Sequence, residues 1–562
     1  MTHQDSKSQS PLINANAGNL PKADDLIDAE KIVQAFYNGI PDPMIPGQQV
    51  EFGTSGHRGC SLDLSFNENH ILAITQAICL YRKNQKISGP LFLGFDTHAL
   101  SAPAFRAALE VLTANDITVM IAKNNEFTPT PVVSHAILGF NRGRTYGFAD
   151  GIIITPSHNP PREGGFKYNP PHGGPAEQSI TNWIQIEANG ILRDKLNSVR
   201  RIPFSIVRNS NNVHEFDYLN SFVRDLGNVV DMKLIQDSKI KIGVDPLGGA
   251  GIHYWQPIAD FYKINLSILN TEVDPTFKFV NVDWDGKIRM DPSSRYVMQS
   301  LIEKRQQYDI AFACDTDHDR HGIVTKQAGL LAPNDFFAVA TDYLFTHRPK
   351  WSTKNEIGKS LATTELLNRV AKRLNRKVYE TPVGFKWFAQ GLLNGQIGFA
   401  CEESAGASFL RHDGRVWTTD KDAFVPCLLA AEITARKDLD LAGYYEKLAQ
   451  ELGKPSYGRI EGFADATQKS LLKNIEREKI DLKELAGEKV TEIFFEAPGN
   501  SVKVGGAKIK TENAWLAVRP SGTEEIYKIY AESFLGDAHL KTVLEAGKKL
   551  VENIIKKKEI AK

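Results

Sequence analysis

The sequence predicts an α/β protein in which parallel sheets are covered by helices. Short apolar runs alternate with helix-like patterns from Phe52 onward, and a polar loop follows each apolar run. In one such unit, the apolar run 91–95 precedes Asp96 and the helix-like pattern 102–113. A repeated order of strand, polar loop and helix is typical of parallel sheets flanked by helices. Ligands bind at the carboxyl ends of such strands, so we expect the functional residues in these polar loops.

The chain is expected to form several domains, because a single hydrophobic core rarely serves more than about 300 residues and this chain has 562. The units of strand, loop and helix fall into three blocks, and the pattern changes after Pro455. We expect a partly disordered N-terminal extension, then α/β/α domains carrying a serine loop, an acidic loop and a Glu-rich loop, then a smaller α+β domain. The expected limits are 1–39, 40–205, 206–330, 331–454 and 455–562.

The two ends of the chain differ from its middle. Residues 1–21 are polar and low in apolar side chains, whereas residues 24–37 show helical spacing of apolar positions. In the last domain, strands are expected in direct succession, which favours an antiparallel sheet. These strands are expected at 493–498, 501–504, 514–518 and 526–533, with a helix at 538–556.

The composition argues against several classes of partner. Lys+Arg and Asp+Glu both total 67, so the net charge of zero gives no general attraction to nucleic acid or an anionic membrane. No apolar stretch approaches the ~20 residues of a membrane span, and residues 1–18 lack the apolar core of a secretory signal. The 5 cysteines show no metal-binding spacing, so we expect a reducing, cytoplasmic location.

A candidate nucleophile follows the apolar run 152–154, where Thr155 and Pro156 lead to Ser157 and His158. A strand that ends in a rigid Pro-rich loop fixes a reactive hydroxyl at the mouth of a cleft. Serine in such a loop is commonly only a turn residue. No Gly-x-Ser-x-Gly motif surrounds Ser157, and no acidic residue is placed to orient His158, so a hydrolase triad is not favoured.

Three carboxylates at alternate positions, Asp315, Asp317 and Asp319, follow another apolar run. Alternate residues of an extended loop point to one side, and hard carboxylate oxygens favour Mg2+, Mn2+ or Ca2+. An EF-hand would need Gly and Glu at its sixth and twelfth positions, which are Arg320 and Lys326. A phosphatase with a nucleophilic Asp and a solvated acidic turn are the remaining alternatives. Because three adjacent acids repel each other without a cation, the sequence predicts a metal site.

Together the two loops indicate phosphoryl transfer on a serine supported by a divalent cation. A phosphorylated Ser157 would add a fourth oxygen ligand to the three Asp carboxylates. Lys167 returns to the same loop beside Arg162. Crowding by positive charge would lower the pKa of Lys167 and suit it to act as a general base, whereas the competing interpretation is a surface lysine on a Gly-rich turn.

Two further clusters have the composition of a sugar-phosphate site. Adjacent acids and a hydroxyl at 402–404 suit recognition of sugar hydroxyls. A second cluster, near the C-terminus, suits a phosphate monoester. It combines a guanidinium, hydroxyls, a glycine whose backbone N–H can approach the phosphate closely, and an ammonium. A plain turn between strands would look similar. These residues are Arg519, Ser521, Gly522, Thr523 and Lys528.

In this order, the motifs at 52–59, 155–160, 315–320, 402–404 and 519–523 resemble the α-D-phosphohexomutase superfamily, and within it the bacterial, glucose-specific branch. The resemblance covers nearly the whole chain from Phe52 to Ser533. It implies catalytic roles for Ser157 as phosphoryl carrier, His158 beside it, Lys167 as base, Arg58 and Arg320, and Mg2+ ligation by Ser157, Asp315, Asp317 and Asp319. It implies substrate contacts by Val383, Gly384, Glu402, Ser404, Arg519, Ser521, Gly522 and Thr523. Lys528, from the composition of the same cluster, is a further candidate.

The resemblance further implies three related α/β/α domains and a smaller fourth domain around a central cleft, with the fourth domain closing over substrate. The implied reaction interconverts α-glucose 1-phosphate and glucose 6-phosphate through glucose 1,6-bisphosphate, with sugar phosphates as the only partners and a monomer or homodimer as the assembly.

Two positions depart from the family pattern. Thr316 stands where relatives have Gly or Pro, and His412 where they often have Lys, so His412, Arg411 and Lys421 are all candidates to contact substrate phosphate.

Two alternatives are kept open. One is a mutase that accepts mannose or both sugars, although the Glu402–Ser404 sequence resembles the glucose-specific branch. The other is a non-catalytic relative that only binds sugar phosphates, which would be expected to lack Ser157, an Asp of the metal loop or Lys167, all of which are present.

Overall fold

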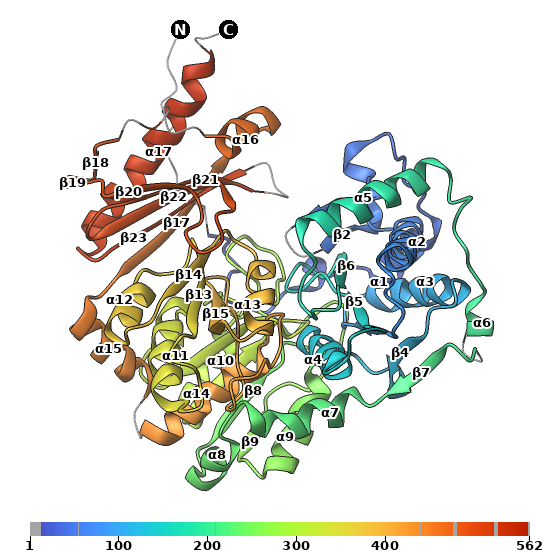
Figure 1. Ribbon diagram of the computed structural model, residues 1–562, viewed down its shortest axis with the longest axis horizontal. Coiled ribbons are helices and arrows are strands. Elements are labelled where there is room, and N and C mark those ends of the chain that lie inside the picture. The colour runs from blue at the N-terminus through green and yellow to red at the C-terminus, as the bar shows by residue number, and fades with distance from the viewer. Residues whose placement is uncertain are drawn as a thin grey trace.

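The structure is a computed structural model that describes residues 13–53, 56–207, 210–437, 440–475, 480, 482–521 and 526–559. Within these residues, the strands form four larger sheets and one two-stranded sheet. Figure 1 shows the first sheet and its helices, in blue to green, on one side of the molecule and the C-terminal sheet, in red, on the other, with the two remaining sheets below and between them. Three α/β units followed by an antiparallel α+β unit confirm the expected fold class.

The first sheet presents the serine loop. Its strands are β1 (Phe52–Gly53), β2 (Gly56–Cys60), β3 (Leu91–Phe95), β4 (Val119–Ala122), β5 (Asp150–Ile154), β6 (Glu163–Asn169) and β7 (Val213–Phe216). Its helices are α1 (Ala29–Asn38), α2 (Glu68–Gln85), α3 (Ser101–Ala114), α4 (Thr130–Asn141), α5 (Gln178–Arg193) and α6 (Phe204–Val207). The order is β1-β2-β6-β5-β3-β4-β7, with β5, β3, β4 and β7 parallel. Successive residues of β5 face opposite sides, because Ile152 and Ile154 share a core with α2, α3 and α5, whereas Ile153 shares one with α4.

The second sheet presents the acidic loop. Its strands are β8 (Ile242–Asp245), β9 (Leu266–Ile268), β10 (Ile310–Cys314), β11 (His321–Thr325) and β12 (Gly329–Leu331), in the order β12-β11-β10-β8-β9. Its helices are α7 (Tyr218–Asp225), α8 (Met232–Ser238), α9 (Ile252–Tyr262) and α10 (Gln299–Glu303). Strands β10 and β11 are antiparallel, with Cys314 opposite His321. Residues 315–320 therefore form the connection of a hairpin.

The third sheet, in the order β14-β13-β15-β16, carries the Glu-rich loop at the end of β15. Its strands are β13 (Glu356–Ser360), β14 (Val378–Thr381), β15 (Ile397–Glu402) and β16 (Gly406–Phe409), and its helices are α11 (Pro333–His347), α12 (Leu366–Arg373), α13 (Ala389–Leu393), α14 (Phe424–Lys437) and α15 (Leu441–Leu452). One continuous apolar cluster includes Ile153, Phe312 and Phe399. The first three sheets therefore share a core, which fixes their loops relative to each other.

The fourth sheet is antiparallel throughout, in the order β17-β23-β22-β21-β20. Its strands are β17 (Ser456–Phe463), β20 (Glu492–Glu496), β21 (Lys503–Lys510), β22 (Ala514–Pro520) and β23 (Ile526–Ser533), beside the pair β18 (Glu484–Leu485) and β19 (Glu488–Lys489). Helices α16 (Ala466–Lys473) and α17 (Asp537–Glu559) cover one face. The other face contacts the third sheet, since Trp515 and Tyr530 pack in one cluster with Leu361.

Short 3-10 helices lie in the connections between these elements. The 3-10 helices are η1 (Ala23–Asp25), η2 (Pro46–Gln48), η3 (Ser61–Asp63), η4 (Lys123–Asn125), η5 (Leu226–Asn228), η6 (Arg305–Gln307) and η7 (Phe385–Trp387). The helix expected at 24–37 is present as α1 but begins later, because the Asp28 carboxylate accepts the backbone N–H of Lys31 and caps it there. Among the described residues, no helix combines the length and apolar character that a membrane span needs.

Candidate active site

Ser157 is held in a strained loop after β5. Its backbone has a φ of +61°, a left-handed conformation that is uncommon for residues other than Gly. The Ser157 N–H donates a hydrogen bond of 2.8 Å to the Thr155 hydroxyl. Its own hydroxyl, on a fully buried side chain, donates 2.8 Å to Asp315 Oδ2. The fold therefore aims this hydroxyl at the acidic loop.

The acidic loop brings the three carboxylates together. Asp315, Asp317 and Asp319 are buried, and one carboxylate oxygen from each lies within 4.8 Å of the others. The backbone N–H groups of Asp319 and Arg320 donate to Asp315 Oδ1 at 3.0 and 2.9 Å. Burial, with Asp317 and Asp319 close by, holds the pKa of Asp315 well above its usual range.

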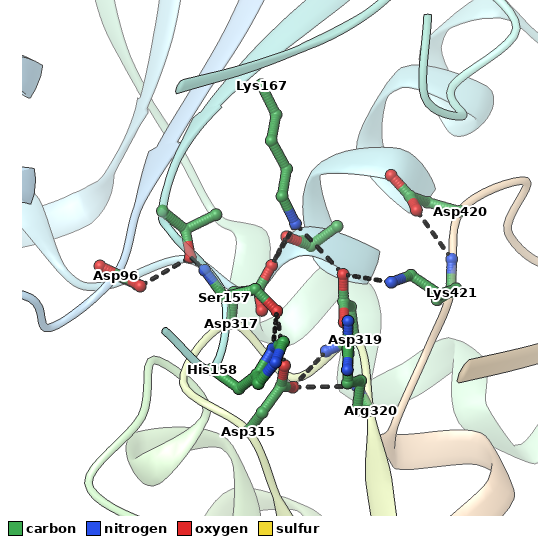
Figure 2. Close-up of polar contacts among 12 residues, drawn as sticks. Asp96, Ser157, His158, Lys167, Asp315, Asp317, Asp319, Arg320, Asp420 and Lys421 are labelled. Carbon is green, nitrogen blue, oxygen red and sulfur yellow. Dashed lines mark hydrogen bonds and ion pairs between the residues drawn. The ribbon is translucent and has the colours of Figure 1, made fainter. Parts of the chain in front are cut away.

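The donor set fits a hard cation. Asp317 Oδ1 and Asp319 Oδ1 are buried and have no hydrogen-bond partner. Buried carboxylate oxygens are costly to leave unpaired, so their convergence indicates an ion that would satisfy them. Oxygen ligands at this spacing suit Mg2+. Figure 2 shows Ser157, Asp315, Asp317 and Asp319 around one point.

Lys167 reaches the same point from β6. Its ammonium donates to Asp317 Oδ2 at 2.6 Å and to Asp319 Oδ2 at 3.1 Å. Burial alone would lower the pKa of Lys167, but the two carboxylates outweigh burial and raise the pKa above its ordinary value. The expectation of a lowered pKa is wrong for this arrangement, because the sequence does not reveal that the lysine pairs with the metal-loop carboxylates.

Two arginines and a histidine lie close to the Ser157 loop. Arg58 donates to the Asn159 side chain at 3.1 Å, and the Arg320 Nε lies 3.7 Å from Asp319 Oδ1. His158 Nδ1 lies 3.4 Å from the Ser157 hydroxyl. Burial, reinforced by the charge of Arg320, holds the pKa of His158 well below its usual range. The lowered pKa favours the neutral ring of His158, so Arg58 and Arg320 carry the positive charge near this loop.

The Glu-rich loop meets a turn after β14. Glu402 Oε1 accepts the backbone N–H of Gly384 at 2.7 Å, and burial raises the pKa of Glu402. Gly384 has a φ of +127°, which only glycine adopts readily. Val383 packs against the cluster between the third and fourth sheets, and Ser404 lies in the turn between β15 and β16. The structure thus brings the two expected sugar-contacting turns together.

Of the three candidate phosphate contacts of the third domain, the structure brings only Lys421 to the acidic loop. Its ammonium lies 2.9 Å from Asp319 Oδ2. Arg411 instead makes a two-pronged ion pair with Asp225, at 2.6 Å for each nitrogen. The backbone N–H of His412 donates to Asn228, and the charges of Arg348 and Glu432 act on its ring. Arg411 and His412 are therefore parts of a contact with α7 and α14.

The expected phosphate cluster lies in the fourth sheet. Arg519 on β22 is directly opposite Lys528 on β23, and Lys528 lies 3.5 Å from Glu461 of β17. Ser521 follows β22 and is buried. Gly522 and Thr523 lie outside the described residues, as do Thr54 and Ser55 of the first motif.

A cavity lies beside the acidic loop, between the first and third sheets. Charged residues from both sides line it, among them Lys167, Asp319, Asp420 and Lys421, together with Asn169 and Gly56. It therefore offers both ammonium donors and carboxylate acceptors to a polar ligand beside the acidic loop.

Comparison with known proteins decides the family. The models of Phosphoglucomutase/phosphomannomutase alpha/beta/alpha domains I, II and III match residues 49–193, 220–329 and 332–452, and that of the C-terminal domain matches 472–548. The chain belongs to the α-D-phosphohexomutase superfamily. Membership makes it an enzyme of the isomerase class that moves a phosphoryl group within its substrate.

Relatives of this superfamily support the assignment over nearly the full length. A phosphoglucomutase of Komagataeibacter xylinus is 52% identical over 533 residues, which covers 95% of this chain and 96% of the relative. The open form of parafusin, a Paramecium phosphoglucomutase, aligns with a TM-score of 0.72 at 20% identity over 91% of this chain and 95% of its own. A putative phosphomannomutase of Thermus thermophilus aligns with a TM-score of 0.69 at 24% identity, covering 91% and 100%. These two structures bear on the fold alone.

Sequence reasoning missed several groups at the phosphohexomutase site. The Thr130 hydroxyl donates to Asp317 Oδ2 at 2.5 Å, and the Thr130 N–H donates to the Asp317 carbonyl. Asp96 accepts a hydrogen bond from Thr155 behind the serine loop. The only available signal was that Thr130 and Asp96 each lie in a polar loop after an apolar run.

Proposed function

We propose that the chain is a phosphoglucomutase that interconverts α-D-glucose 1-phosphate and D-glucose 6-phosphate through a phosphoserine at Ser157 and a glucose 1,6-bisphosphate intermediate. The observation that carries this proposal is the hydrogen bond from the Ser157 hydroxyl to Asp315 within the cluster of three buried carboxylates. The 52% identity to a phosphoglucomutase supports the choice of sugar.

The carboxylates of Asp315, Asp317 and Asp319, with an oxygen of phosphorylated Ser157, would hold Mg2+. When bound there, Mg2+ draws charge from the phosphoryl oxygens and so stabilises the transferring group. Arg58 and Arg320 would add fixed positive charge beside the phosphoserine loop. The site thus supplies charge stabilisation before the sugar arrives.

Lys167 is the proposed general base, because its side chain lies in the cavity beside the acidic loop. Its ammonium would first have to release a proton to solvent, which Mg2+ bound to Asp317 and Asp319 would favour by competing for these carboxylates. The neutral amine could then accept the proton of the attacking sugar hydroxyl. The sugar presents first one and then the other phosphorylated end to Ser157, so it must bind in two orientations. Glu402 and Ser404, together with the turn at Val383 and Gly384, would contact the ring hydroxyls of the sugar in both orientations. The phosphate that is not reacting would be held by Arg519, Ser521, Gly522, Thr523 and Lys528, with Lys421 beside the acidic loop.

We further propose that glucose 1,6-bisphosphate activates the enzyme by phosphorylating Ser157. The only ligands of the enzyme would be Mg2+ and sugar phosphates. The enzyme would act in the cytoplasm as a monomer or homodimer. The cysteines support a reducing location, since Cys60, Cys79, Cys314, Cys401 and Cys427 are all free and buried.

The test is peptide mapping by mass spectrometry after incubation with glucose 1,6-bisphosphate and Mg2+. We expect one phosphoryl group on the peptide that contains Ser157, and its loss on addition of glucose 6-phosphate. Phosphate on another residue would overturn the proposal. Comparing kcat/KM for glucose 1-phosphate and mannose 1-phosphate tests the sugar, and a preference for mannose would favour the alternative specificity.

A further inference from the structure

A cluster of buried polar side chains lies directly behind the Ser157 loop, and no step of the proposed reaction uses it. Its centre is Asp96, which follows β3 and is 1% exposed. The Asp96 carboxylate accepts four hydrogen bonds. They come from the His98 N–H at 3.0 Å, the Ser101 hydroxyl at 2.5 Å, His98 Nδ1 at 2.8 Å and the Thr155 hydroxyl at 2.6 Å. All lone pairs of this carboxylate are therefore engaged.

His98 is a buried imidazolium in this cluster. Its Nδ1 faces the Asp96 carboxylate and its Nε2 lies 3.0 Å from the Asn159 carbonyl oxygen. Both partners only accept hydrogen bonds, so both ring nitrogens must donate, which requires the protonated ring. Burial alone would lower the pKa of His98, but Asp96 outweighs burial and raises it.

The cluster makes hydrogen bonds to the serine loop on both sides of Ser157. Before it, the Thr155 hydroxyl donates to Asp96 and in turn accepts the Ser157 N–H at 2.8 Å. After it, His98 holds the Asn159 carbonyl. Because the Thr155 proton is committed to Asp96, its lone pairs are aimed at the Ser157 N–H, which stabilises the left-handed φ of +61° there.

We propose that Asp96, His98 and Thr155 are positioning residues that hold the Ser157 backbone in the conformation that aims its oxygen at the acidic loop for phosphoryl transfer. The proposal rests on the proposed role of Ser157 as phosphoryl carrier. A displacement of about 1 Å at a reacting atom lowers a rate by up to about a hundredfold, whereas a group that only supports the fold would leave kcat intact.

The same cluster extends to a proposed catalytic group. The side chain of Asn159, whose carbonyl His98 holds, accepts a hydrogen bond from Arg58 at 3.1 Å and donates to Glu163 at 2.7 Å. Loss of the His98 contact would therefore shift Arg58 as well as the loop. This predicts that His98 and Thr155 variants share one kinetic defect, seen in kcat rather than in KM.

The test compares Thr155→Val, which keeps the shape and loses the hydroxyl, with Thr155→Ser, which keeps the hydroxyl. The matched control is Thr75→Val in α2, because Thr75 is also fully buried and its hydroxyl also donates one hydrogen bond, to the Ile71 carbonyl of the same helix. The measurements are kcat and KM for glucose 1-phosphate and the single-turnover rate at which glucose 1,6-bisphosphate phosphorylates Ser157.

For Thr155→Val we expect kcat and the phosphorylation rate to fall by about ten- to a hundredfold, with KM within about twofold of the unmodified protein. Thr155→Ser is expected to recover most of both rates, and Thr75→Val to retain them. If Thr155→Val does not fold, His98→Gln is measured in its place, since glutamine keeps a polar side chain but cannot carry the charge, and the same fall in kcat is expected.

Phosphorylation of Ser157 at the unmodified rate in a folded Thr155→Val or His98→Gln protein would overturn the inference and leave the proposed function intact. An unmodified protein that takes phosphate on another residue, or on none, would overturn the proposed function, and this inference with it.

Discussion

The Ser157 hydroxyl donates a hydrogen bond of 2.8 Å to Asp315 although the two residues are 158 positions apart in the sequence. Ser157 follows β5 of the first sheet and Asp315 follows β10 of the second. The contact depends on a core that the two sheets share, because Ile153 and Phe312 belong to one apolar cluster. Packing between domains therefore sets the geometry of the proposed phosphoryl transfer.

Ser157→Ala is expected to abolish turnover of glucose 1-phosphate, because no other hydroxyl replaces the lost phosphoryl acceptor. The variant should also take no phosphate from glucose 1,6-bisphosphate, as measured by intact mass. Its thermal unfolding midpoint should fall slightly, because Asp315 Oδ2 loses a buried hydrogen bond, which costs about 1–3 kcal/mol. Turnover equal to that of the unmodified protein would show that the serine is not the carrier.

Asp317→Asn is expected to weaken Mg2+ binding by at least about a hundredfold, because loss even of a group that supports a metal ligand costs about 10- to 100-fold. Titration calorimetry with Mg2+ measures this directly. Asp309→Asn is the matched control. Asp309 directly precedes β10, whereas Asp317 follows it, and Asp309 pairs with Lys326 on the surface. Equal affinities in the two variants would contradict the assignment of the site.

Arg519→Ala is expected mainly to raise KM, by about ten- to a hundredfold, because a hydrogen bond to a charged phosphate is worth about 1.5–3 kcal/mol. The value of kcat should change less, since Arg519 lies in the fourth sheet, away from Ser157. Arg415→Ala controls for loss of an arginine, as Arg415 pairs with Asp413 at the surface. The check is steady-state kinetics with glucose 1-phosphate.

Lys421→Met and His412→Ala are expected to differ. Lys421 lies beside Asp319 in the cavity, so its loss should lower kcat/KM by about tenfold or more. His412 faces α14 and Asn228, so its loss should leave kcat/KM within about twofold. A larger kinetic effect at His412 than at Lys421 would show that the cavity beside Lys421 is not where substrate phosphate binds.

Asp225→Asn is expected to lower the thermal unfolding midpoint at pH 7, because it leaves Arg411 buried without its carboxylate, a loss that costs about 3–5 kcal/mol. Partial burial would raise the pKa of Asp225, but hydrogen bonds from His135 and Arg411 outweigh it and lower the pKa.

A lowered folded-state pKa means that this stabilisation is complete above the unfolded-state pKa of about 3.9 and is lost as pH falls further. The difference in midpoint between Asp225→Asn and the unmodified protein should thus be constant from pH 7 to about pH 5 and shrink below about pH 4. A difference that grows on acidification would contradict the assigned direction.

The sequence predicted those parts of the fold whose signals are local. The strands before Ser157 and Asp315 are short β-branched or apolar runs, and both are present as β5 and β10. Strand β17 was not predicted, because none of its residues is fully buried, and the half-buried face carries Gly458 and Gly462 beside Ile460 instead of a run of apolar side chains. Strand β21 was expected only at 501–504, since Gly505 and Gly506 interrupt the pattern. A side chain at Gly506 would lie 2.0 Å from the Val518 carbonyl, so close strand pairing requires glycine there.

The sequence predicted which residues of the site could bind a metal ion, because this depends on residue type and spacing. The convergence of Asp315, Asp317 and Asp319 followed from their alternation. The pairing of Lys167 with two of these carboxylates, and the separation of His412 from Lys421, depend on how the sheets pack and leave no local signal. The same holds for His98, whose two acceptors lie on different loops.

The central claim is that a phosphoryl group on Ser157 is bound to a cation held by Asp315, Asp317 and Asp319. The most direct test is electron–nuclear double resonance on the protein phosphorylated by glucose 1,6-bisphosphate, with Mn2+ in place of Mg2+. We predict a 31P hyperfine coupling to the bound Mn2+ that disappears in the unphosphorylated protein and in Ser157→Ala. Bound Mn2+ without any 31P coupling in the phosphorylated protein would contradict the claim.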